Sequence, residues 1–178
     1  MKFTESNLKG VYIVDLTPIA DERGYFARMF AKKEYEALGL NASISQGNTS
    51  FNKHSFTLRG LHYQRAPHAE VKIVRCIRGS IFDVAVDIRP SSPTFKQWVG
   101  VELSDKNNRQ LYIPEGFAHG FLTLEENTEV QYLVTADYHP QSEGGIRYDD
   151  PTFAIQWPHA PTVQSEKDQN WPLFEEVL

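Results

Sequence analysis

Six short apolar stretches follow one another between residues 71 and 134, and their spacing constrains the fold more than any other feature. Each is rich in β-branched or aromatic residues, and turn-forming clusters such as Pro114-Glu115-Gly116 and Glu125-Glu126-Asn127 separate them. Many short strands at regular spacing are typical of an all-β sandwich or barrel. The predicted strands are 71–78, 80–88, 97–103, 110–113, 117–124 and 130–134.

The flanking sequence adds fewer regular elements. We expect a strand at 11–16, a turn at 21–24 before the aromatic pair Tyr25 and Phe26, and a helix at 30–40 that ends near Gly39. The stretch 44–50 carries Gln46 and Asn48 among small polar residues and receives no assigned element. The proline-rich C-terminal part should be irregular and lie over the barrel, with one short helix near 164–169.

Composition narrows the class of protein. The 178 residues are 40% hydrophobic and 23% charged with a net charge of −5, which predicts one globular domain spanning 1–178. No basic run suggests nucleic-acid binding. The single Cys76 excludes an internal disulfide, and neither a signal peptide nor a membrane-spanning stretch is evident. We therefore expect a cytoplasmic protein with no membrane partner.

Strand alternation indicates a polar interior. Residues two apart share a face of a strand, and on this basis Lys72, Asp83, His119 and Tyr132 each lie on a largely apolar face. Any one of them alone is more often a buried polar group with a satisfied hydrogen bond. Four on neighbouring strands of a closed fold predict a polar lumen instead.

The segment Arg59-Gly60-Leu61-His62-Tyr63-Gln64 offers chemistry for such a lumen. It could be a plain strand with one satisfied histidine, but an arginine that suits phosphate lies three residues from a proton-transfer side chain. His62 could remove a proton, Tyr132 could supply one, and Lys72 could stabilise an enolate oxygen. Asp168 could hold the His62 ring in one tautomer, and Arg59 and Arg23 could bind phosphates.

A metal site is the competing interpretation. His62, Glu70 and His119 could ligate an ion, and Pro114 to His119 resembles the second motif of metal-binding cupins. The first such motif usually offers two histidines one residue apart, whereas Gln64 stands in the second place here. Metals normally need three or more good protein ligands. We therefore expect no metal and no cofactor.

Several motifs together resemble the dTDP-4-dehydrorhamnose 3,5-epimerase family over nearly the whole chain and in the family's order. They are Arg59 to Gln64, Lys72-Ile73-Val74-Arg75, Arg78-Gly79 through Asp83-Val84, Ser91 to Phe95, Pro114 to Phe121, Tyr132, Tyr138, Gly145-Ile146-Arg147 with Asp149-Asp150-Pro151, and Ser165 to Asp168.

The resemblance implies a cupin-type jelly roll (double-stranded β-helix) with a few short peripheral helices, assembled as a homodimer. It implies an isomerase that inverts C3 and C5 of dTDP-4-dehydro-6-deoxy-D-glucose, on the way to dTDP-L-rhamnose and surface polysaccharides. His62 would be the base, paired with Asp168; Lys72 would stabilise the enolate and Tyr132 would be the opposite acid. The implied substrate-binding residues are Arg23 and Phe26 from the partner, Gln46, Asn48, Arg59, Asp83, His119, Tyr138, Glu143 and Arg147.

Three departures affect the substrate rather than the chemistry. Arg28 stands where many relatives have a Glu that helps to read the base, Tyr148 replaces a common Trp, and 67–72 resembles a branch with less certain substrates. The alternatives are a C3- or C5-monoepimerase, or an epimerase of another nucleotide-linked keto sugar. A non-catalytic sugar-binding cupin would not need both an acid and a base. A ketoisomerase on the same fold would not be expected to carry the whole set.

Overall fold

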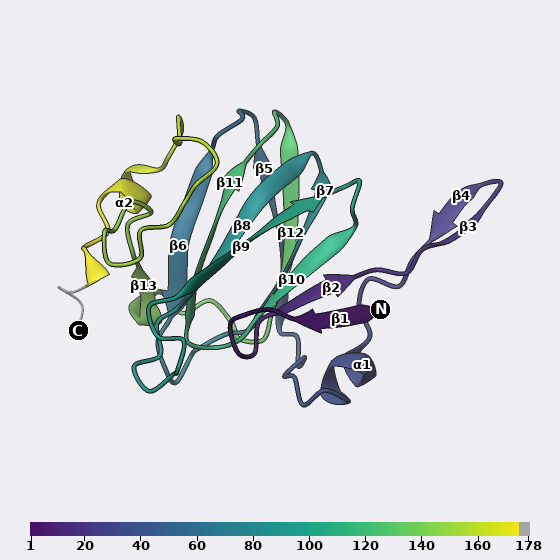
Figure 1. Ribbon diagram of the computed structural model, residues 1–178, viewed down its shortest axis with the longest axis horizontal. Helices are drawn as coiled ribbons and strands as arrows, with labels where there is room; N and C mark the ends of the chain where they lie inside the picture. The colour runs from purple at the N-terminus through teal and green to yellow at the C-terminus, as the bar shows by residue number, and fades with distance from the viewer. Residues whose placement is uncertain (175–178) are drawn as a thin grey trace.

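Two antiparallel β-sheets packed face to face form the body of the protein (Figure 1). The computed structural model describes residues 1–174. One sheet has six strands in the order β1-β2-β10-β7-β12-β5, and the other has five in the order β13-β6-β11-β8-β9. Most neighbouring strands are distant in sequence because the chain passes repeatedly between the sheets, as in a jelly roll. The predicted all-β cupin-type jelly roll is confirmed.

The observed elements agree closely with the six strands predicted between residues 71 and 134, each of which is found to within two residues at either end. The elements are β1 (Lys2–Glu5), β2 (Tyr12–Asp15), β3 (Ile19–Asp21), β4 (Gly24–Phe26), α1 (Lys32–Glu36), β5 (Gln46–Asn52), β6 (Leu58–Gln64), β7 (Lys72–Arg78), β8 (Ser80–Asp87), β9 (Trp98–Ser104), β10 (Arg109–Ile113), β11 (Phe117–Thr123), β12 (Thr128–Val134), the 3₁₀ turn η1 (Pro140–Ser142), β13 (Glu143–Gly145) and α2 (Glu166–Gln169).

Three local predictions need correction. The helix expected at 30–40 is only the five residues of α1, because it buries a single side chain, Tyr35, and then passes through turns to Gly39, which has a φ of +71°. The unassigned stretch around Gln46 and Asn48 is strand β5, which pairs with β12 at the edge of its sheet. Strand β1 was also not predicted.

The space between the sheets is filled with apolar side chains at one end. Val74, Cys76 and Val130 of the six-stranded sheet meet Ile81 and Phe121 of the five-stranded sheet, and all five are almost completely buried. The alternation of β7, β8 and β12 therefore directs the predicted faces inward. Burying such side chains stabilises the fold by about 1.5–3 kcal/mol each.

The outer faces of the sheets are covered by different parts of the chain. The C-terminal part packs Phe153 and Phe174 against Val84 and Val86, while Tyr35 of α1 packs against the six-stranded sheet. This explains why β8 and β11 are apolar on both faces. The C-terminal part is mostly irregular, as predicted, and α2 is the short helix expected near 164–169. No helix among residues 1–174 is long and apolar enough to cross a membrane.

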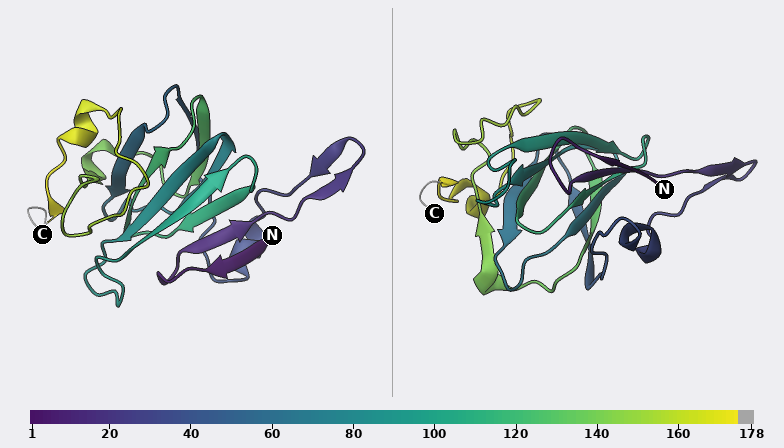
Figure 2. Two further views of the ribbon diagram at one scale, coloured as in Figure 1. Left: turned by 45° about the horizontal axis from the view of Figure 1, so that its top comes forward. Right: turned by 60° about the horizontal axis from the view of Figure 1, so that its bottom comes forward.

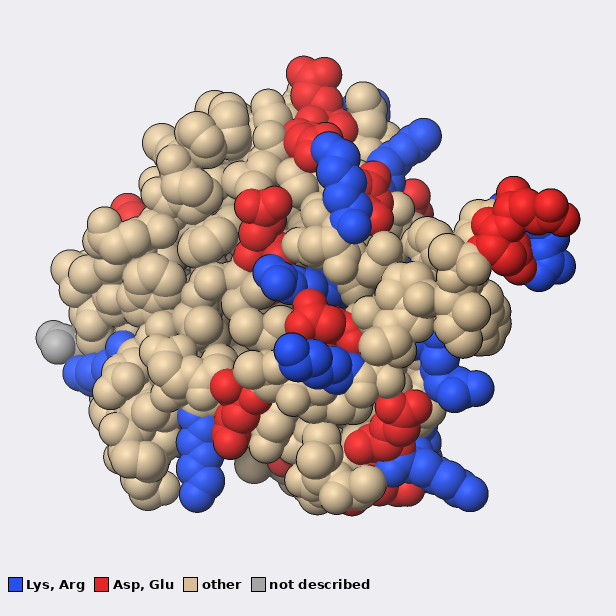
Figure 3. All heavy atoms as spheres, turned by 45° about the vertical axis from the view of Figure 1, so that its right-hand side comes forward, with Lys and Arg blue, Asp and Glu red and all other residues tan. Residues whose placement is uncertain are grey.

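The hairpin β3–β4 projects away from both sheets (Figure 2). Its apolar side chains face outward, and Ile19, Tyr25 and Phe26 are 71%, 57% and 66% exposed. At its tip Asp21 pairs with Arg23. On the face of the molecule shown in Figure 3, charged side chains of both signs are interspersed.

Candidate active site

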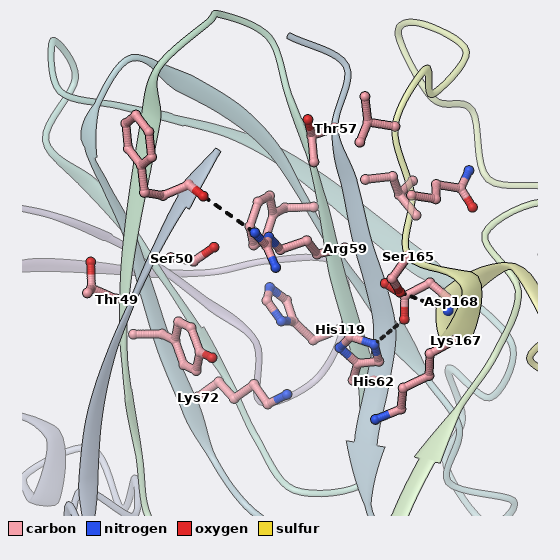
Figure 4. A pocket seen from close by; sticks show the side chains of 16 residues that line it. Thr49, Ser50, Thr57, Arg59, His62, Lys72, His119, Ser165, Lys167 and Asp168 are labelled. Atoms are coloured by element: carbon pink, nitrogen blue, oxygen red, sulfur yellow. Dashed lines mark hydrogen bonds and ion pairs between the residues drawn. The ribbon is translucent and has the colours of Figure 1, made fainter. Parts of the chain in front are cut away.

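A cavity of about 700 Å³ lies between the two sheets beneath the C-terminal segment 163–168 (Figure 4). Lys72, His119 and Tyr132, three of the four residues predicted to share a polar lumen, line it together with Arg59 and His62. A second hollow of about 380 Å³ shares His62, Lys72 and Tyr132 with the first. The two hollows thus meet at the residues predicted to carry the chemistry.

His62 and Asp168 form a short polar contact inside this cavity. His62 points inward from β6, and its Nε2 lies 2.6 Å from Oδ1 of Asp168 on α2. An ionised carboxylate accepts hydrogen bonds and has no hydrogen to donate, so Nε2 carries the hydrogen. Nδ1 is then the unprotonated nitrogen, and it faces the cavity (Figure 4). A ring held in this tautomer by a carboxylate is suited to act as a general base.

Backbone and indole groups hold the Asp168 carboxylate in place. Oδ2 accepts a hydrogen bond from the Gly60 amide at 3.2 Å, and Oδ1 accepts one from Trp171 Nε1 at 3.3 Å. The Ser165 hydroxyl accepts from the Asp168 amide at 3.1 Å and caps α2. Burial alone would raise the pKa of Asp168, but the bonds from His62, Gly60 and Trp171 outweigh it, so the pKa lies below its usual value.

Gly60 is required by the close approach of β6 to β11. It has a φ of +112°, and a Cβ atom there would lie 2.7 Å from both Gly120 Cα and the His119 carbonyl oxygen. Any larger residue would push the two strands apart and carry the amide away from Asp168. The glycine of the 59–64 motif therefore supports the dyad rather than contacting a ligand.

Lys72 and Tyr132 lie across the cavity on the facing sheet, on adjacent strands β7 and β12. The Lys72 ammonium lies 3.3 Å from the Glu70 carboxylate, and both side chains are nearly buried. The pKa of Tyr132 is raised, chiefly by burial and then by the Glu70 charge, against an opposing effect of Arg59. The phenol is therefore protonated at neutral pH.

Two cations other than Lys72 line the cavity. Arg59 Nε donates to the Asn52 side-chain oxygen at 2.7 Å, and Asn52 itself is buried and donates to the Thr128 carbonyl. Lys167 of α2 also lines the cavity. Fixed cations at this place suit a diphosphate.

His119 contacts the cavity, but Asp83 does not. Asp83 is completely buried, and its Oδ1 lies 2.8 Å from His119 Nε2. The Asp83 side chain thus lies behind His119, so we expect it to act through this histidine. Strand alternation gave the right face for Asp83 and could not show that His119 covers it.

Tyr138 and Glu143, which line the second hollow, are joined in a chain of bonds to Lys167, which lines the first. The Tyr138 hydroxyl donates to Glu143 Oε2 at 2.9 Å, and Lys167 donates to Glu143 Oε1 at 2.5 Å. Gln46 and Asn48 of β5 line the same hollow, and Gln46 accepts a hydrogen bond from the Tyr138 amide. The structure thus brings three of the predicted substrate-binding residues, Gln46, Asn48 and Tyr138, together near the chemistry.

The remaining predicted site residues lie outside the cavity in the described part of the chain. Arg147 pairs with Asp149 on the outer side of α2 and does not line the cavity. Arg23, Phe26 and Arg28 are exposed, the first two on the projecting hairpin. A subunit's own cavity therefore does not contain them.

Gln64, which stands where metal cupins place a histidine, is held by several hydrogen bonds. Its amide nitrogen donates to the His68 and Asp137 carbonyls, and its oxygen accepts from the His139 amide. Glu70, the third ligand of the metal interpretation, pairs with Lys72. Within residues 1–174 no three His, Cys, Asp or Glu side chains are grouped to hold a metal ion.

Sequence reasoning did not single out four residues that shape this site: Lys167, Trp171, Asn52 and Glu70 in its pairing with Lys72. Lys167 and Glu70 lie beside residues that were chosen, so proximity was a usable signal. Asn52 and Trp171 carry no local signal, because their contacts depend on the fold.

Comparison with known proteins identifies the family. Residues 5–176 match the family model described as dTDP-4-dehydrorhamnose 3,5-epimerase. The chain belongs to the dTDP-4-dehydrorhamnose 3,5-epimerase family. The enzyme of that name from Salmonella typhimurium is 48% identical over 170 residues, which cover 94% of this chain and 92% of that protein.

Solved structures in this family have the same fold. The dTDP-6-deoxy-D-glucose-3,5-epimerase from Legionella pneumophila in complex with dTDP-4-keto-L-rhamnose has a TM-score of 0.94 at 42% identity, covering 99% of this chain and 94% of that one. A 3'-monoepimerase from Streptomyces bikiniensis in complex with dTDP-quinovose has a TM-score of 0.89 at 29% identity, covering 97% and 89%. The predictions of an isomerase and of the 3,5-epimerase activity are confirmed.

Proposed function

We propose that this epimerase inverts C3 and C5 of dTDP-4-dehydro-6-deoxy-D-glucose with His62 as base and Tyr132 as acid. The observation that carries the assignment is the cavity flanked by the His62–Asp168 dyad on one sheet and by Lys72 and Tyr132 on the other. A base and an acid on opposite faces of one sugar ring are what inversion at carbon requires.

The substrate's diphosphate is the group that Arg59, His119 and Lys167 suit, since all three line the wider cavity. The nucleoside would then extend along Gln46, Asn48 and Tyr138 of the second hollow. This arrangement leaves the sugar between His62 and Tyr132. Asn52 contributes by holding the Arg59 guanidinium toward the cavity.

The reaction begins when Nδ1 of His62 takes the proton from a carbon next to the C4 carbonyl. The electron pair of that C–H bond moves to the C4 oxygen, where the Lys72 ammonium stabilises the enolate. Asp168 stabilises the imidazolium that forms. Tyr132 then donates its proton to the opposite face of the same carbon, and a new C–H bond forms as the carbonyl is restored. Exchange with solvent returns both side chains to their starting states.

Turnover in deuterated water tests these roles. The wild-type enzyme should place deuterium at C3 and C5, seen by NMR of the product. His62→Ala should abolish exchange at both carbons, while Tyr132→Phe should retain exchange and slow inversion, because the base and the Lys72 cation remain. General acid–base groups contribute about 10² to 10⁴ in rate. Exchange that persists in a folded His62→Ala protein would contradict the assignment.

A homodimer in which each hairpin β3–β4 completes the neighbour's site is the proposed assembly. The support is the exposed apolar surface of Ile19, Tyr25 and Phe26 on a hairpin that projects from its own subunit. Arg23 would add a cation to the partner's diphosphate subsite, and Phe26 would contact the nucleoside.

Mixing two inactive variants tests this assembly. Arg23→Ala and His62→Ala proteins should each be impaired. Unfolded and refolded together, they should regain about a quarter of wild-type activity, because half of the dimers are mixed and each of these has one intact site. No recovery, in dimers shown to be mixed, would exclude a shared site.

A monoepimerase is the second candidate, because a 3'-monoepimerase shares the fold at a TM-score of 0.89. The same NMR experiment separates the two, since a monoepimerase exchanges the proton of only one carbon.

Arg28 should alter the preference for the nucleotide base, because a guanidinium cannot accept the hydrogen bond that a Glu accepts. Binding of dTDP, UDP, CDP and GDP to the wild type and to Arg28→Glu measures this. We expect the enzyme to work in the cytoplasm, where its nucleotide substrate would be made.

A further inference from the structure

Glu70 is an ionisable group in the cavity to which the proposed reaction gives no task. It precedes β7 and lines the second hollow, together with His62, Lys72 and Tyr132. Its side chain is only 13% exposed. A nearly buried carboxylate is costly to keep unless it is paired and hydrogen-bonded.

Both oxygens of Glu70 have partners. Oε1 lies 3.3 Å from the Lys72 ammonium, which is 12% exposed. Oε2 accepts from Gln64 Nε2 at 3.4 Å, and Gln64 is fixed by its bonds to the His68 and Asp137 carbonyls. The carboxylate therefore joins β7 of one sheet to β6 of the other.

The electrostatic effect of Glu70 on Tyr132 opposes that of Arg59. An ammonium near a phenol favours the tyrosinate, and a carboxylate near the same phenol disfavours it. The charged and titratable groups that line the two hollows around Tyr132 are Arg59, His62 and Tyr63 of β6, Lys72 of β7, Glu70 before it, His119 of β11, Tyr138, Glu143 of β13, and Lys167 and Asp168 of α2. Without Glu70, the Lys72 ammonium would lose the carboxylate that pairs with it.

We propose that Glu70 is a positioning residue whose carboxylate anchors Lys72 and keeps the Tyr132 hydroxyl in its neutral, proton-carrying form. The cavity needs a cation to stabilise the enolate oxygen and a neutral acid beside it, and these two needs conflict. Glu70 resolves the conflict because it balances the cation locally while leaving Lys72 hydrogens free for substrate. The direction of the Tyr132 pKa shift agrees: burial raises this pKa most, and the Glu70 charge is the next cause that raises it. The inference rests on the proposed role of Tyr132, but the ionisation of Tyr132 can be measured without turnover.

The test is an NMR titration of Tyr132 in protein labelled with ¹³C at the tyrosine ring carbon that bears the hydroxyl. The resonance is assigned by its loss in Tyr132→Phe. Glu70→Gln keeps the size of the side chain and removes the charge, and it should lower the pKa of Tyr132 by about one unit. In turnover, the basic limb of the kcat profile should move to lower pH by the same amount.

Two further variants control for the position and the packing of the carboxylate. Glu129→Gln removes a carboxylate from the same strand as Tyr132 but on its other face, where Glu129 pairs with Thr49, and should leave the titration unchanged. Glu70→Asp keeps the charge and should keep the high pKa.

Three results would overturn the inference. They are an unchanged Tyr132 titration in folded Glu70→Gln, an equal fall in Glu129→Gln, or a fall in Glu70→Asp as large as in Glu70→Gln. If Glu70→Gln does not fold, Lys72→Met decides. There the carboxylate loses its cation, so Tyr132 should titrate above the wild type, and a lower value would refute the balance described. None of these outcomes depends on whether the enzyme inverts one centre or two.

Discussion

Replacing Asp168 with asparagine isolates the charge of the dyad from its shape. The asparagine oxygen can take the place of Oδ1 and accept from Trp171, while its nitrogen takes the place of Oδ2 and gives up the bond from the Gly60 amide. The other contacts of the C-terminal segment remain, and the main loss at the dyad is the negative charge 2.6 Å from His62 Nε2. Asp168→Asn should therefore slow proton abstraction with little change in substrate binding.

The size of the effect follows from burial on the two sides of the pair. A neighbouring opposite charge favours the charged form by about 1–3 units, or about 1.4–4 kcal/mol. The His62 side chain is 33% exposed and the Asp168 side chain only 5%, so solvent screens the pair in part and the lower half of the range applies. We expect exchange to slow by about 10- to 100-fold.

The assay is the initial rate of deuterium incorporation at C3 and C5, followed by NMR with saturating substrate. Asp149→Asn is the matched control, because it removes a carboxylate that pairs with Arg147 outside the cavity. Circular dichroism and unfolding curves check that both variants are folded. Wild-type exchange in Asp168→Asn would show that His62 does not need the carboxylate, and the dyad would lose its assigned role.

Further predictions concern the framework and metal dependence. Gly60→Ala should cost about 2–5 kcal/mol of unfolding free energy in urea, because the new Cβ would meet backbone atoms at 2.7 Å and the φ is positive; a loss below about 1 kcal/mol would contradict this. Burial acts to raise the pKa of Asp87, but bonds from Arg89, Ser92 and Thr94 lower it from 3.8 to about 2. Because the folded-state pKa is the lower one, this stabilisation, about 2–3 kcal/mol, is complete above the unfolded value and is lost as the pH falls through about 2. Asp87→Asn should therefore be less stable than wild type at pH 7 and equal to it near pH 2, and an equal deficit at both would refute the linkage. Activity should survive treatment with a chelator, because the Gln64 side chain is hydrogen-bonded to backbone groups. Activity that is lost with the chelator and restored by one divalent ion would overturn this prediction.

The sequence predicted best what depends on a local period. The strands from β7 to β12 are apolar on at least one face and end in turn residues, so their bounds and inward faces could be read directly. Strand β5 escaped because it is an edge strand of small polar residues whose alternate side chains are exposed. The helix predicted at 30–40 was too long, because the helix ends at Glu36 and the apolar residues after it lie in irregular chain.

The candidate site depends on contacts between residues far apart in the sequence, and the alternation of side chains along a strand cannot predict such contacts. Alternation placed Asp83 on the inner face but could not reveal that His119 shields it, since this contact depends on the pairing of β8 with β11 in the same sheet. Asp168 and His62 are joined across 106 positions, so the residues alone could offer this pair only as one possibility, and the resemblance to the family made it specific. Glu70 could be noticed beside Lys72, but its neighbour Gln64 is brought in by the other sheet.

The His62–Asp168 bond has a consequence for how the enzyme comes into being. The strands of both sheets precede residue 146, whereas the segment with Asp168 is attached later, through bonds such as that from the Leu58 amide to the Val163 carbonyl. A chain emerging from the ribosome can therefore complete both sheets before His62 has its carboxylate partner. Keto sugars that reach such an immature molecule would be enolised more slowly. Full chemical competence is in this way delayed until the segment with Asp168 has been built and docked.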